Sequence, residues 1–275
     1  MSDGWRRLKF NLLGRSDGRP DQEEGAMGNP ITWFEMIGPD PEKKAAFYAE
    51  LFGWHTESME GGYITIDTHA GRGMNGGVTA PQPQAPGTVR SVFYAEAPDI
   101  QAKLDEAGSL GARTLMPVTV MPDIVTFALF ADPWGNHIGL MQGDGSGSRV
   151  SAGDNPPIDW VEIGCAEPKK AWDFYRELFG WTIEGDMSGE DGGPIHGGFD
   201  TGGSVGARGG IGSSPDGEPR VDIYAAVDDL PKYLDRAAGH GGTVVMPAMK
   251  VDDETEIAMF NDPQGGTFGL YGPTH

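Results

Sequence analysis

The segment FYAELFGW at residues 47–54 recurs as FYRELFGW at residues 174–181, 127 positions later. Three further pairs of segments recur in the same order: ITWFE at 31–35 with IDWVE at 158–162, GARTLMP at 111–117 with GGTVVMP at 241–247, and DPWGN at 132–136 with DPQGG at 262–266. The first of these pairs keeps the offset of 127, whereas the last two are offset by 130. Similarity that keeps its order over this length indicates a tandem repeat of one structural unit.

Each copy is predicted to contain two βαβββ units. In the first copy, Pro41 suits the first position of a helix, and the helix is expected to end at Gly53. Apolar periodicity and glycine turns predict strands at 31–37, 54–59, 62–69, 71–80, 91–97, 113–120, 124–132 and 136–142, and helices at 41–52 and 98–107. Because the second copy repeats this order, the chain is expected to hold four such units.

The residues outside the two copies form a tail and a spacer. Residues 1–29 match nothing in the second copy, and we expect them to be a mobile N-terminal tail. Residues 143–157 are rich in Gly, Ser and Pro, which is typical of a linker. This division predicts one domain over residues 30–142 and a second over residues 158–275.

Composition excludes several classes of protein. The chain carries 41 acidic and 20 basic residues, a net charge of −21, and such a surface repels nucleic acid and anionic lipid. No apolar run approaches the ~20 residues that a transmembrane helix needs, and the N-terminal residues lack the apolar stretch of a secretory signal peptide. The single cysteine, Cys165, excludes an intramolecular disulfide and a cysteine-rich zinc module. We therefore expect a cytoplasmic protein with no nucleic-acid or membrane partner.

The repeated motifs resemble those of the vicinal-oxygen-chelate superfamily, which includes glyoxalase I, bleomycin-resistance proteins and extradiol dioxygenases. The resemblance rests on the two FY-x-ELFGW segments and on DPWGNHIGL and DPQGGTFGL, and it covers residues 31–142 and 158–272. It implies an α+β, glyoxalase-like fold in which each pair of βαβββ units forms one eight-stranded, open, cleft-forming sheet. It also implies that two such sheets pack face to face, in a monomer with pseudo-dimeric halves or in a homodimer.

Enzymes of this superfamily hold a divalent metal ion with side chains from the first, fifth and eighth strands. The resemblance places these positions at Trp33, Val92 and Gly139 in the first copy and at Trp160, Asp222 and Gly269 in the second. Of these six residues, only the aspartate offers a metal-binding group. We therefore expect neither a metal ion nor another cofactor. An error in register leaves open a displaced metal site at Glu35 and His137, although the second copy has Thr267 in place of that histidine.

Aromatic and acidic side chains are expected to line the two clefts. The predicted ligand contacts are Trp33, Glu35, Val92, Tyr94, His137, Gly139 and Met141 in the first copy and Trp160, Glu162, Asp222, Tyr224, Gly269 and Tyr271 in the second. An apolar cleft with a few convergent polar groups is typical of a small-molecule site. We predict that the protein binds a small aromatic or apolar organic molecule, either to sequester it or for metal-free acid–base chemistry by Glu35, Glu162 or Asp222.

Three alternatives remain open at this point. The tryptophans could fill the space that substrate and metal occupy in relatives, so that the clefts bind nothing. The chain could instead be a metal-dependent lyase or dioxygenase of the same superfamily, or a pure interaction protein. Whichever ligand binds, the acidic surface favours a cationic or neutral molecule over an anionic one.

Overall fold

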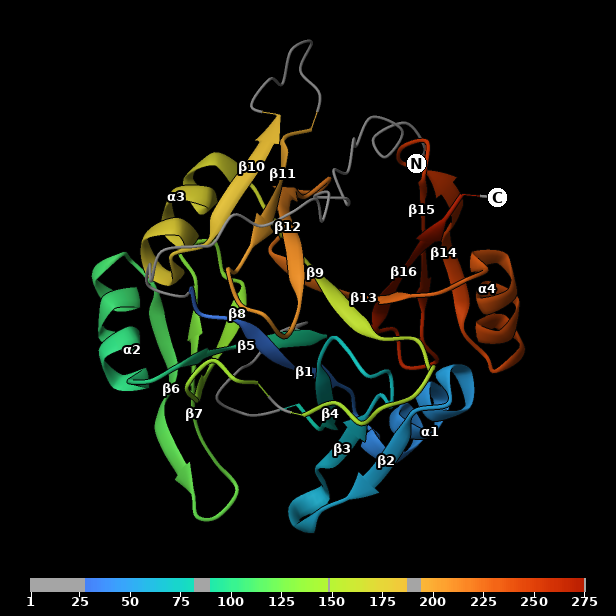
Figure 1. The fold of residues 1–275 in the computed structure, drawn as a ribbon, viewed down its shortest axis with the longest axis horizontal. Coiled ribbons are helices and arrows are strands. Elements are labelled where there is room, and N and C mark those ends of the chain that lie inside the picture. The colour runs from blue at the N-terminus through green and yellow to red at the C-terminus, as the bar shows by residue number, and fades with distance from the viewer. Residues whose placement is uncertain (1–27, 82–89, 148, 187–193, 275) are drawn as a thin grey trace.

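The computed structural model describes residues 28–81, 90–147, 149–186 and 194–274, and these residues form two eight-stranded sheets (Figure 1). All strands of the first sheet come from the first copy of the repeat, and all strands of the second sheet come from the second copy. The prediction of an α+β fold with two open eight-stranded sheets is confirmed. The predicted N-terminal tail lies outside the described residues, except for Gly28 and Asn29.

The first sheet is built from two βαβββ units. Its first unit comprises β1 (Ile31–Ile37), α1 (Pro41–Phe52), β2 (His55–Ser58), a short 3-10 helix η2 (Glu60–Gly62), β3 (Ile64–Asp67) and β4 (Asn75–Thr79). Its second unit comprises β5 (Ser91–Ala97), α2 (Ile100–Ser109), β6 (Arg113–Met121), β7 (Val125–Ala131) and β8 (His137–Gln142). The strand order is β2-β3-β4-β1-β5-β8-β7-β6, so that the first strands of the two units, β1 and β5, pair antiparallel at the centre.

The second sheet repeats this arrangement. Its first unit comprises β9 (Ile158–Cys165), α3 (Pro168–Phe179), β10 (Thr182–Asp186), β11 (His196–Asp200) and β12 (Arg208–Ser213). Its second unit comprises β13 (Arg220–Ala226), α4 (Leu230–Gly239), β14 (Thr243–Lys250), β15 (Thr255–Asn261) and β16 (Thr267–Pro273). The strand order β10-β11-β12-β9-β13-β16-β15-β14 matches that of the first sheet position by position.

Local sequence sets the ends of the helices. The Asp40 side chain caps the first turn of α1, Pro41 occupies its first position, and Gly53 ends it with a φ of 79°, a left-handed conformation that favours glycine. These ends agree with the sequence-based prediction. The sequence also predicts a helix from Pro98, whereas α2 begins two residues later because the Asp99 side chain caps its first turn.

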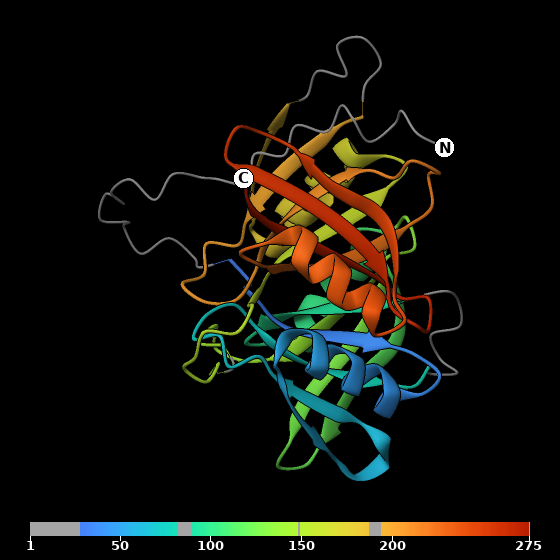
Figure 2. The same cartoon turned by 90° about the vertical axis from the view of Figure 1, so that its right-hand side faces the viewer.

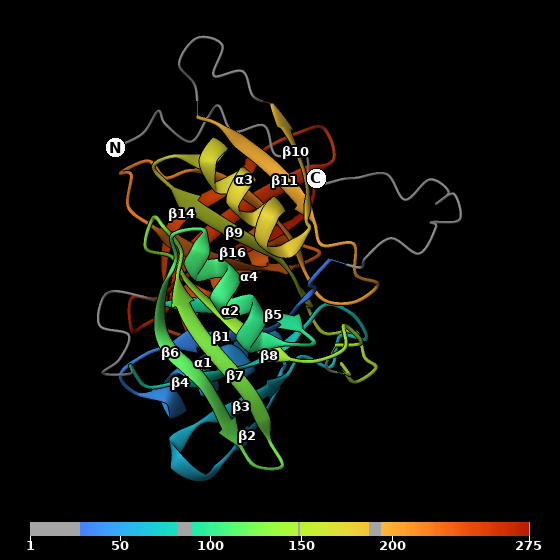
Figure 3. The same ribbon diagram turned by 90° about the vertical axis from the view of Figure 1, so that its left-hand side faces the viewer.

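The repeated FY-x-ELFGW motif forms the contact between the halves. The helix α1 lies beside α4, and α2 lies beside α3 (Figures 2 and 3). The last residue of each motif reaches the segment just before the first strand of the other half. The Trp54 indole donates a hydrogen bond to the Pro156 carbonyl at 2.8 Å, and the Trp181 indole donates to the Asn29 carbonyl at 2.8 Å. These contacts are related by the repeat, so the halves pack as two symmetric partners would.

Two buried aspartates hold the same helices from the opposite half. Asp262 of the DPQGG turn accepts a hydrogen bond from Tyr48 of α1 at 3.1 Å and forms an ion pair with Lys44. Asp132 of the DPWGN turn accepts a hydrogen bond from Tyr175 of α3 at 2.8 Å. Each aspartate also accepts backbone N–H bonds within its own turn. The two motifs that carry the family resemblance therefore hold the halves together.

A single apolar core runs through both halves, built from the helices and the strand residues that face them. Ring contacts cross between the halves within it, including Tyr48 with Phe268 at a centroid distance of 5.0 Å and Phe93 with Trp181 at 6.1 Å. Each sheet also carries a separate apolar cluster on its other face. Among the described residues, no helix is long and apolar enough to cross a membrane.

Candidate ligand-binding clefts

The two separate apolar clusters lie on the sheet faces where the sequence predicts the clefts, and we call them cleft 1 and cleft 2. Cleft 1, on the first sheet, consists of buried Val92, Tyr94 and Leu129 with half-buried Trp33, Ile37, Leu115, Met116, Phe127 and Met141. Cleft 2, on the second sheet, consists of buried Trp160, Tyr224, Met246, Ile257 and Met259 with half-buried Met249, Val251 and Tyr271. Most of the apolar residues that the sequence predicts as ligand contacts therefore lie together, one group in each half.

The strand register aligns three of the predicted positions in each cleft. The row runs Trp33–Tyr94–Gly139 in the first half and Trp160–Tyr224–Gly269 in the second. In both halves the tyrosine ring occupies the space that a Cβ on the glycine would need. The resemblance assigns Val92 and Asp222 to the fifth-strand metal position, but their register partners are Glu35 and Glu162, so they lie outside this row.

Glu35 lies in cleft 1 within a network of aromatic donors. The Tyr94 hydroxyl donates to Glu35 Oε2 at 2.8 Å, the Tyr63 hydroxyl donates to the same carboxyl, and Trp33 Nε1 donates to the Tyr63 hydroxyl at 3.0 Å. Tyr63 can enter the network because Gly77 has no side chain, and its hydroxyl occupies the space of the missing Cβ. Burial raises the pKa of the Glu35 carboxyl, although both tyrosine hydroxyls act to lower it. Within the described residues, no Lys, Arg or His forms an ion pair with this glutamate.

Glu162 occupies the same position in cleft 2 but has a different partner. His196 Nε2 lies 3.1 Å from Oε2 and 3.3 Å from Oε1 of Glu162, and Trp160 Nε1 donates to Oε1 at 2.6 Å. The exposed fraction of the side chain is 6% for the histidine and 12% for the glutamate. The His196 imidazole overlies Gly210, the register partner of Glu162. Tyr63 likewise overlies Gly77, the register partner of Glu35. Cleft 2 thus has an imidazole where cleft 1 has a phenol.

Asp222 and Tyr224 supply the other polar groups of cleft 2. Arg220 Nε lies 3.3 Å from Asp222 Oδ2. Burial raises the pKa of Asp222 to about 6, with the charge of Arg220 acting to lower it and that of Glu162 acting to raise it. The Tyr224 hydroxyl donates to the Met259 sulfur at 3.7 Å, which is a weak acceptor.

His137 is buried at the start of β8. Burial and the charge of Arg113 lower the pKa of its imidazole, which favours the neutral form. Within the described residues, no hydrogen bond or ion pair connects His137 to Glu35. Among the described residues, these two side chains belong to no group of three or more His, Cys, Asp or Glu that could hold a metal ion. The equivalent Thr267 donates a hydrogen bond to Asn261 at 3.0 Å.

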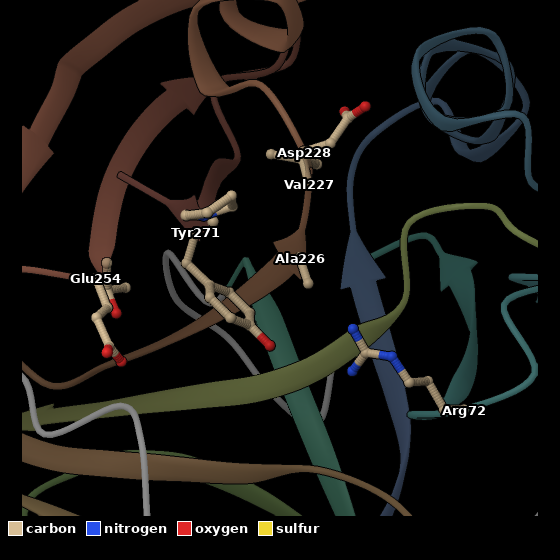
Figure 4. Close-up of a pocket in the computed structure, with 9 residues that line it drawn as sticks. Arg72, Ala226, Val227, Asp228, Glu254 and Tyr271 are labelled. Atoms are coloured by element: carbon tan, nitrogen blue, oxygen red, sulfur yellow. The ribbon is translucent and has the colours of Figure 1, made fainter. Parts of the chain in front are cut away.

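Tyr271 lies between cleft 2 and a pocket at the border of the halves. This pocket has a volume of about 420 Å³, and Arg72 of the first half lines it together with Asp228, Glu254 and Tyr271 of the second. Figure 4 shows the Arg72 guanidinium pointing across the pocket toward the Tyr271 hydroxyl. That hydroxyl donates to Asp159 at 2.6 Å, and Arg72 pairs with the same carboxylate. The predicted ligand contact Tyr271 therefore also takes part in joining the halves.

Sequence reasoning missed Tyr63 and His196, although they define the polar chemistry of the clefts. The two residues occupy equivalent positions that are 133 residues apart in the sequence. The glycines beneath them, Gly77 and Gly210, are separated by the same number. The offsets of 127 and 130 found in the motifs do not pair these positions. Glycine in the interior of a strand signals a close approach by another group, and this signal could have located both residues.

The residues at the predicted metal positions do not fit a divalent ion. The indoles of Trp33 and Trp160 are hydrogen-bond donors only, and Gly139 and Gly269 lie beneath tyrosine rings. Across the part of the chain that the structure describes, no group of three or more His, Cys, Asp or Glu side chains is arranged to hold an ion. No chemical step can therefore be assigned to a metal ion at these positions.

Two family models match the chain, one in each half. Residues 157–270 match the model described as the Glyoxalase/Bleomycin resistance protein/Dioxygenase superfamily, and residues 34–141 match the model described as a Glyoxalase-like domain. A Mycobacterium bovis protein named "Putative glyoxylase CFP32" is 25% identical over 267 residues, which are 92% of this chain and 98% of that protein. The anthracycline biosynthesis protein DnrV of Streptomyces peucetius is 30% identical over 129 residues, which are 41% of this chain and 45% of that protein.

Solved structures share the fold over both halves. The Mn(II)-bound glyoxalase from Novosphingobium aromaticivorans superposes with a TM-score of 0.65 at 14% identity, covering 90% of this chain and 82% of that one. The 2,3-dioxygenase LapB from Pseudomonas sp. KL28 superposes with a TM-score of 0.65 at 12% identity, covering 91% of this chain and 94% of that one. At these identities the likeness shows the fold alone.

Proposed function

Because the chain is a tandem member of the glyoxalase/bleomycin resistance protein/dioxygenase superfamily, we propose that it binds a small aromatic or apolar organic molecule in its clefts without a metal ion. The observation that carries this proposal is the row of tryptophan, tyrosine and glycine across each cleft. This row has a tryptophan at the first-strand position that the family resemblance implies for a metal ligand, and a tyrosine ring covers the glycine at the eighth-strand position. Aromatic surface with a few nearby carboxyl groups suits an apolar ring that carries one polar substituent.

The carboxyl groups of the clefts favour two outcomes of binding. Sequestration needs only the aromatic surface and a hydrogen bond to orient the molecule. Metal-free acid–base chemistry would use Glu35, Glu162 or Asp222 to move a proton of the bound molecule. Burial raises the pKa of Glu35 and of Asp222, which brings both carboxyls closer to the range in which a group exchanges protons near neutral pH.

A metal-dependent lyase or dioxygenase is the second candidate function. It draws support from the Mn(II)-bound glyoxalase and the 2,3-dioxygenase that share the fold. Elemental analysis of the purified protein separates the two candidates. Our proposal predicts no stoichiometric metal ion, whereas about one ion per half that resists mild chelation would overturn it and restore the metal-dependent candidate.

Ligand screening by thermal shift tests the proposal directly. A library of aromatic metabolites and drugs should contain a compound that stabilises the protein, by ~2.7 kcal/mol at a concentration of 100 times its Kd. Trp33→Ala and Trp160→Ala should reduce this shift if the clefts are the sites. If no compound binds and both variants only lose stability, the tryptophans fill the clefts and the proposal fails.

The proposal concerns a small molecule and includes no nucleic-acid or membrane partner. A net charge of −21 gives the reason, because it opposes binding to phosphate groups and to anionic lipid. Within the chain, the contact between the halves fits a monomer with pseudo-dimeric halves. A homodimer and a cytoplasmic location remain predictions from the sequence.

A further inference from the structure

The two clefts differ in how far their own side chains close them. In cleft 2, Trp160 is 5% exposed and packs against the buried methionines Met246 and Met259. In cleft 1, the equivalent Trp33 is half-buried, and five other apolar residues around it are half-buried as well. Methionine is flexible and fills irregular space, which suits it to pack around the tryptophan of cleft 2. Cleft 1 presents the larger accessible apolar surface.

The hairpin beside cleft 1 also has a more apolar tip than the equivalent hairpin beside cleft 2. The strands β6 and β7, which contribute Leu115, Met116 and Phe127 to cleft 1, meet in a hairpin that extends beyond the sheet (Figure 3). Its tip exposes Val120, Met121 and Ile124, which are 64%, 44% and 59% accessible. The equivalent positions in the second half are Lys250, Val251 and Glu254. The first half therefore exposes apolar side chains at a hairpin tip that carries charges in the second half, and exposed apolar patches often mark sites of interaction.

The partner of the cleft carboxyl is the third difference. In cleft 2, His196 lies within hydrogen-bond distance of Glu162 and can balance its charge. In cleft 1, the described groups that hydrogen-bond to Glu35 are the neutral hydroxyls of Tyr63 and Tyr94. A buried carboxylate that lacks a cationic partner costs free energy, and a bound cation would remove that cost.

We propose that cleft 1 is the ligand site of this protein and that it binds an organic cation, an amine or quaternary ammonium on an aromatic or apolar body. This inference rests on the function proposed above and names the class of ligand. The cationic group lies at Glu35, with the rings of Trp33, Tyr63 and Tyr94 beside it. Aromatic rings attract cations through their negative faces, and tryptophan does so best. The apolar body lies on the half-buried surface that includes Phe127 and Met141.

The net charge of the chain supports the same class of ligand. At −21, the protein attracts cations from solution and repels anions. A carboxylate ligand would meet this repulsion and would also place a second negative charge beside Glu35. A neutral aromatic molecule would fill the apolar surface but would leave the glutamate without a cation.

Calorimetric titration of the full chain with a matched pair of probes tests the proposal. The cationic probe is protonated 1-naphthalenemethylamine, and the neutral probe of similar shape is 1-naphthalenemethanol. We expect the amine to bind at least about tenfold more tightly than the alcohol. Glu35→Gln keeps the size of the side chain and its capacity to accept hydrogen bonds but removes the charge. It should therefore weaken binding of the amine about tenfold and leave binding of the alcohol within about twofold.

Two further variants complete the experiment. Glu57→Gln removes one charge from the exposed end of β2 and controls for net charge, and the amine should bind it as it binds the unmodified chain. Glu162→Gln changes the equivalent residue of cleft 2. If this variant loses binding of the amine while Glu35→Gln keeps it, the assignment to cleft 1 is overturned. Equal binding of both probes would overturn the cationic class but leave the proposed function standing. Failure of both probes to bind would count against the proposed function as well.

Discussion

The two halves have the same strand order, but different side chains contact their equivalent carboxyl groups. Glu35 and Glu162 occupy the same place on their strands, and each has a glycine as its neighbour on the next strand. In the first half Tyr63 fills the space above that glycine, and in the second half His196 does so. The side chain above this glycine is therefore a phenol beside Glu35 and an imidazole beside Glu162. A repeated fold can change its site chemistry without changing its strand order.

The contact between the halves shows the same kind of divergence. Asp262 has both a tyrosine and Lys44 as partners, and both charged groups are almost fully buried. Asp132 has the equivalent tyrosine, but Ala171 stands at the position of the lysine. Burial raises the pKa of Asp132, which its hydrogen bonds with Asn136 and the tyrosine act to lower. Among the described residues, hydrogen bonds alone hold Asp132, whereas Asp262 also forms an ion pair with Lys44.

Lys44→Met should have the largest effect on stability. It would make the contact at Asp262 resemble the contact at Asp132, which has no lysine at the equivalent position. Removal of one partner of a buried ion pair leaves an uncompensated charge and costs ~3–5 kcal/mol. Urea unfolding monitored by tryptophan fluorescence measures this loss. The double variant Lys44→Met/Asp262→Asn should regain most of it, because the remaining charge is also removed. A loss below about 1 kcal/mol in the single variant would show that the ion pair contributes little.

Truncation of the two cleft tryptophans should have the next largest effect on stability, and the two losses should be unequal. Trp160→Ala empties a buried position among methionines and should cost ~3 kcal/mol. Trp33→Ala truncates a half-buried side chain on a more open surface and should cost about half as much. The same unfolding measurement compares the two variants. Equal losses would contradict the description of cleft 2 as closed and cleft 1 as open.

Asp222→Asn should have a smaller effect that depends on pH. Because folding raises the pKa of Asp222 from 3.8 to about 6, its ionised form destabilises the folded state. This cost is absent below the unfolded pKa and fully present above about pH 6. The variant should therefore gain ~2 kcal/mol over the unmodified chain between pH 4 and pH 7. Cleft 1 has Val92 at the equivalent position and offers no matching change. A stability difference that does not vary over this range would contradict the assignment.

Much of the fold could be predicted because the repeat constrains it. Two copies of each motif fixed the order of the elements, and turn residues such as Pro41 and Gly53 located the ends of α1. The motifs did not reveal that Tyr48 and Asp262 meet, since that contact joins residues 214 positions apart in different halves. Local patterns define elements, whereas the partners of a buried polar group depend on how the elements pack.

The candidate site could be predicted only in part. Alternation along β1 placed Trp33 and Glu35 on one face, and the row through Tyr94 agrees with that placement. The register between strands was beyond this reasoning, which did not foresee that Val92 pairs with Glu35 and lies outside the row of Trp33 and Tyr94. Tyr63 was missed because the copies differ in length before this position, so their motif offsets do not align it with its counterpart.

The most direct test of the account exchanges the residue that covers the glycine beside the cleft carboxyl group. In Tyr63→His, an imidazole should pair with Glu35 as His196 pairs with Glu162. Calorimetric titration with protonated 1-naphthalenemethylamine should then show binding weakened about tenfold relative to the unmodified chain, a change of ~1.4 kcal/mol. Binding of neutral 1-naphthalenemethanol should remain within about twofold, which confirms that the variant is folded. If Tyr63→His binds the amine as tightly as the unmodified chain does, the partner of the carboxylate does not select the ligand, and the account is contradicted.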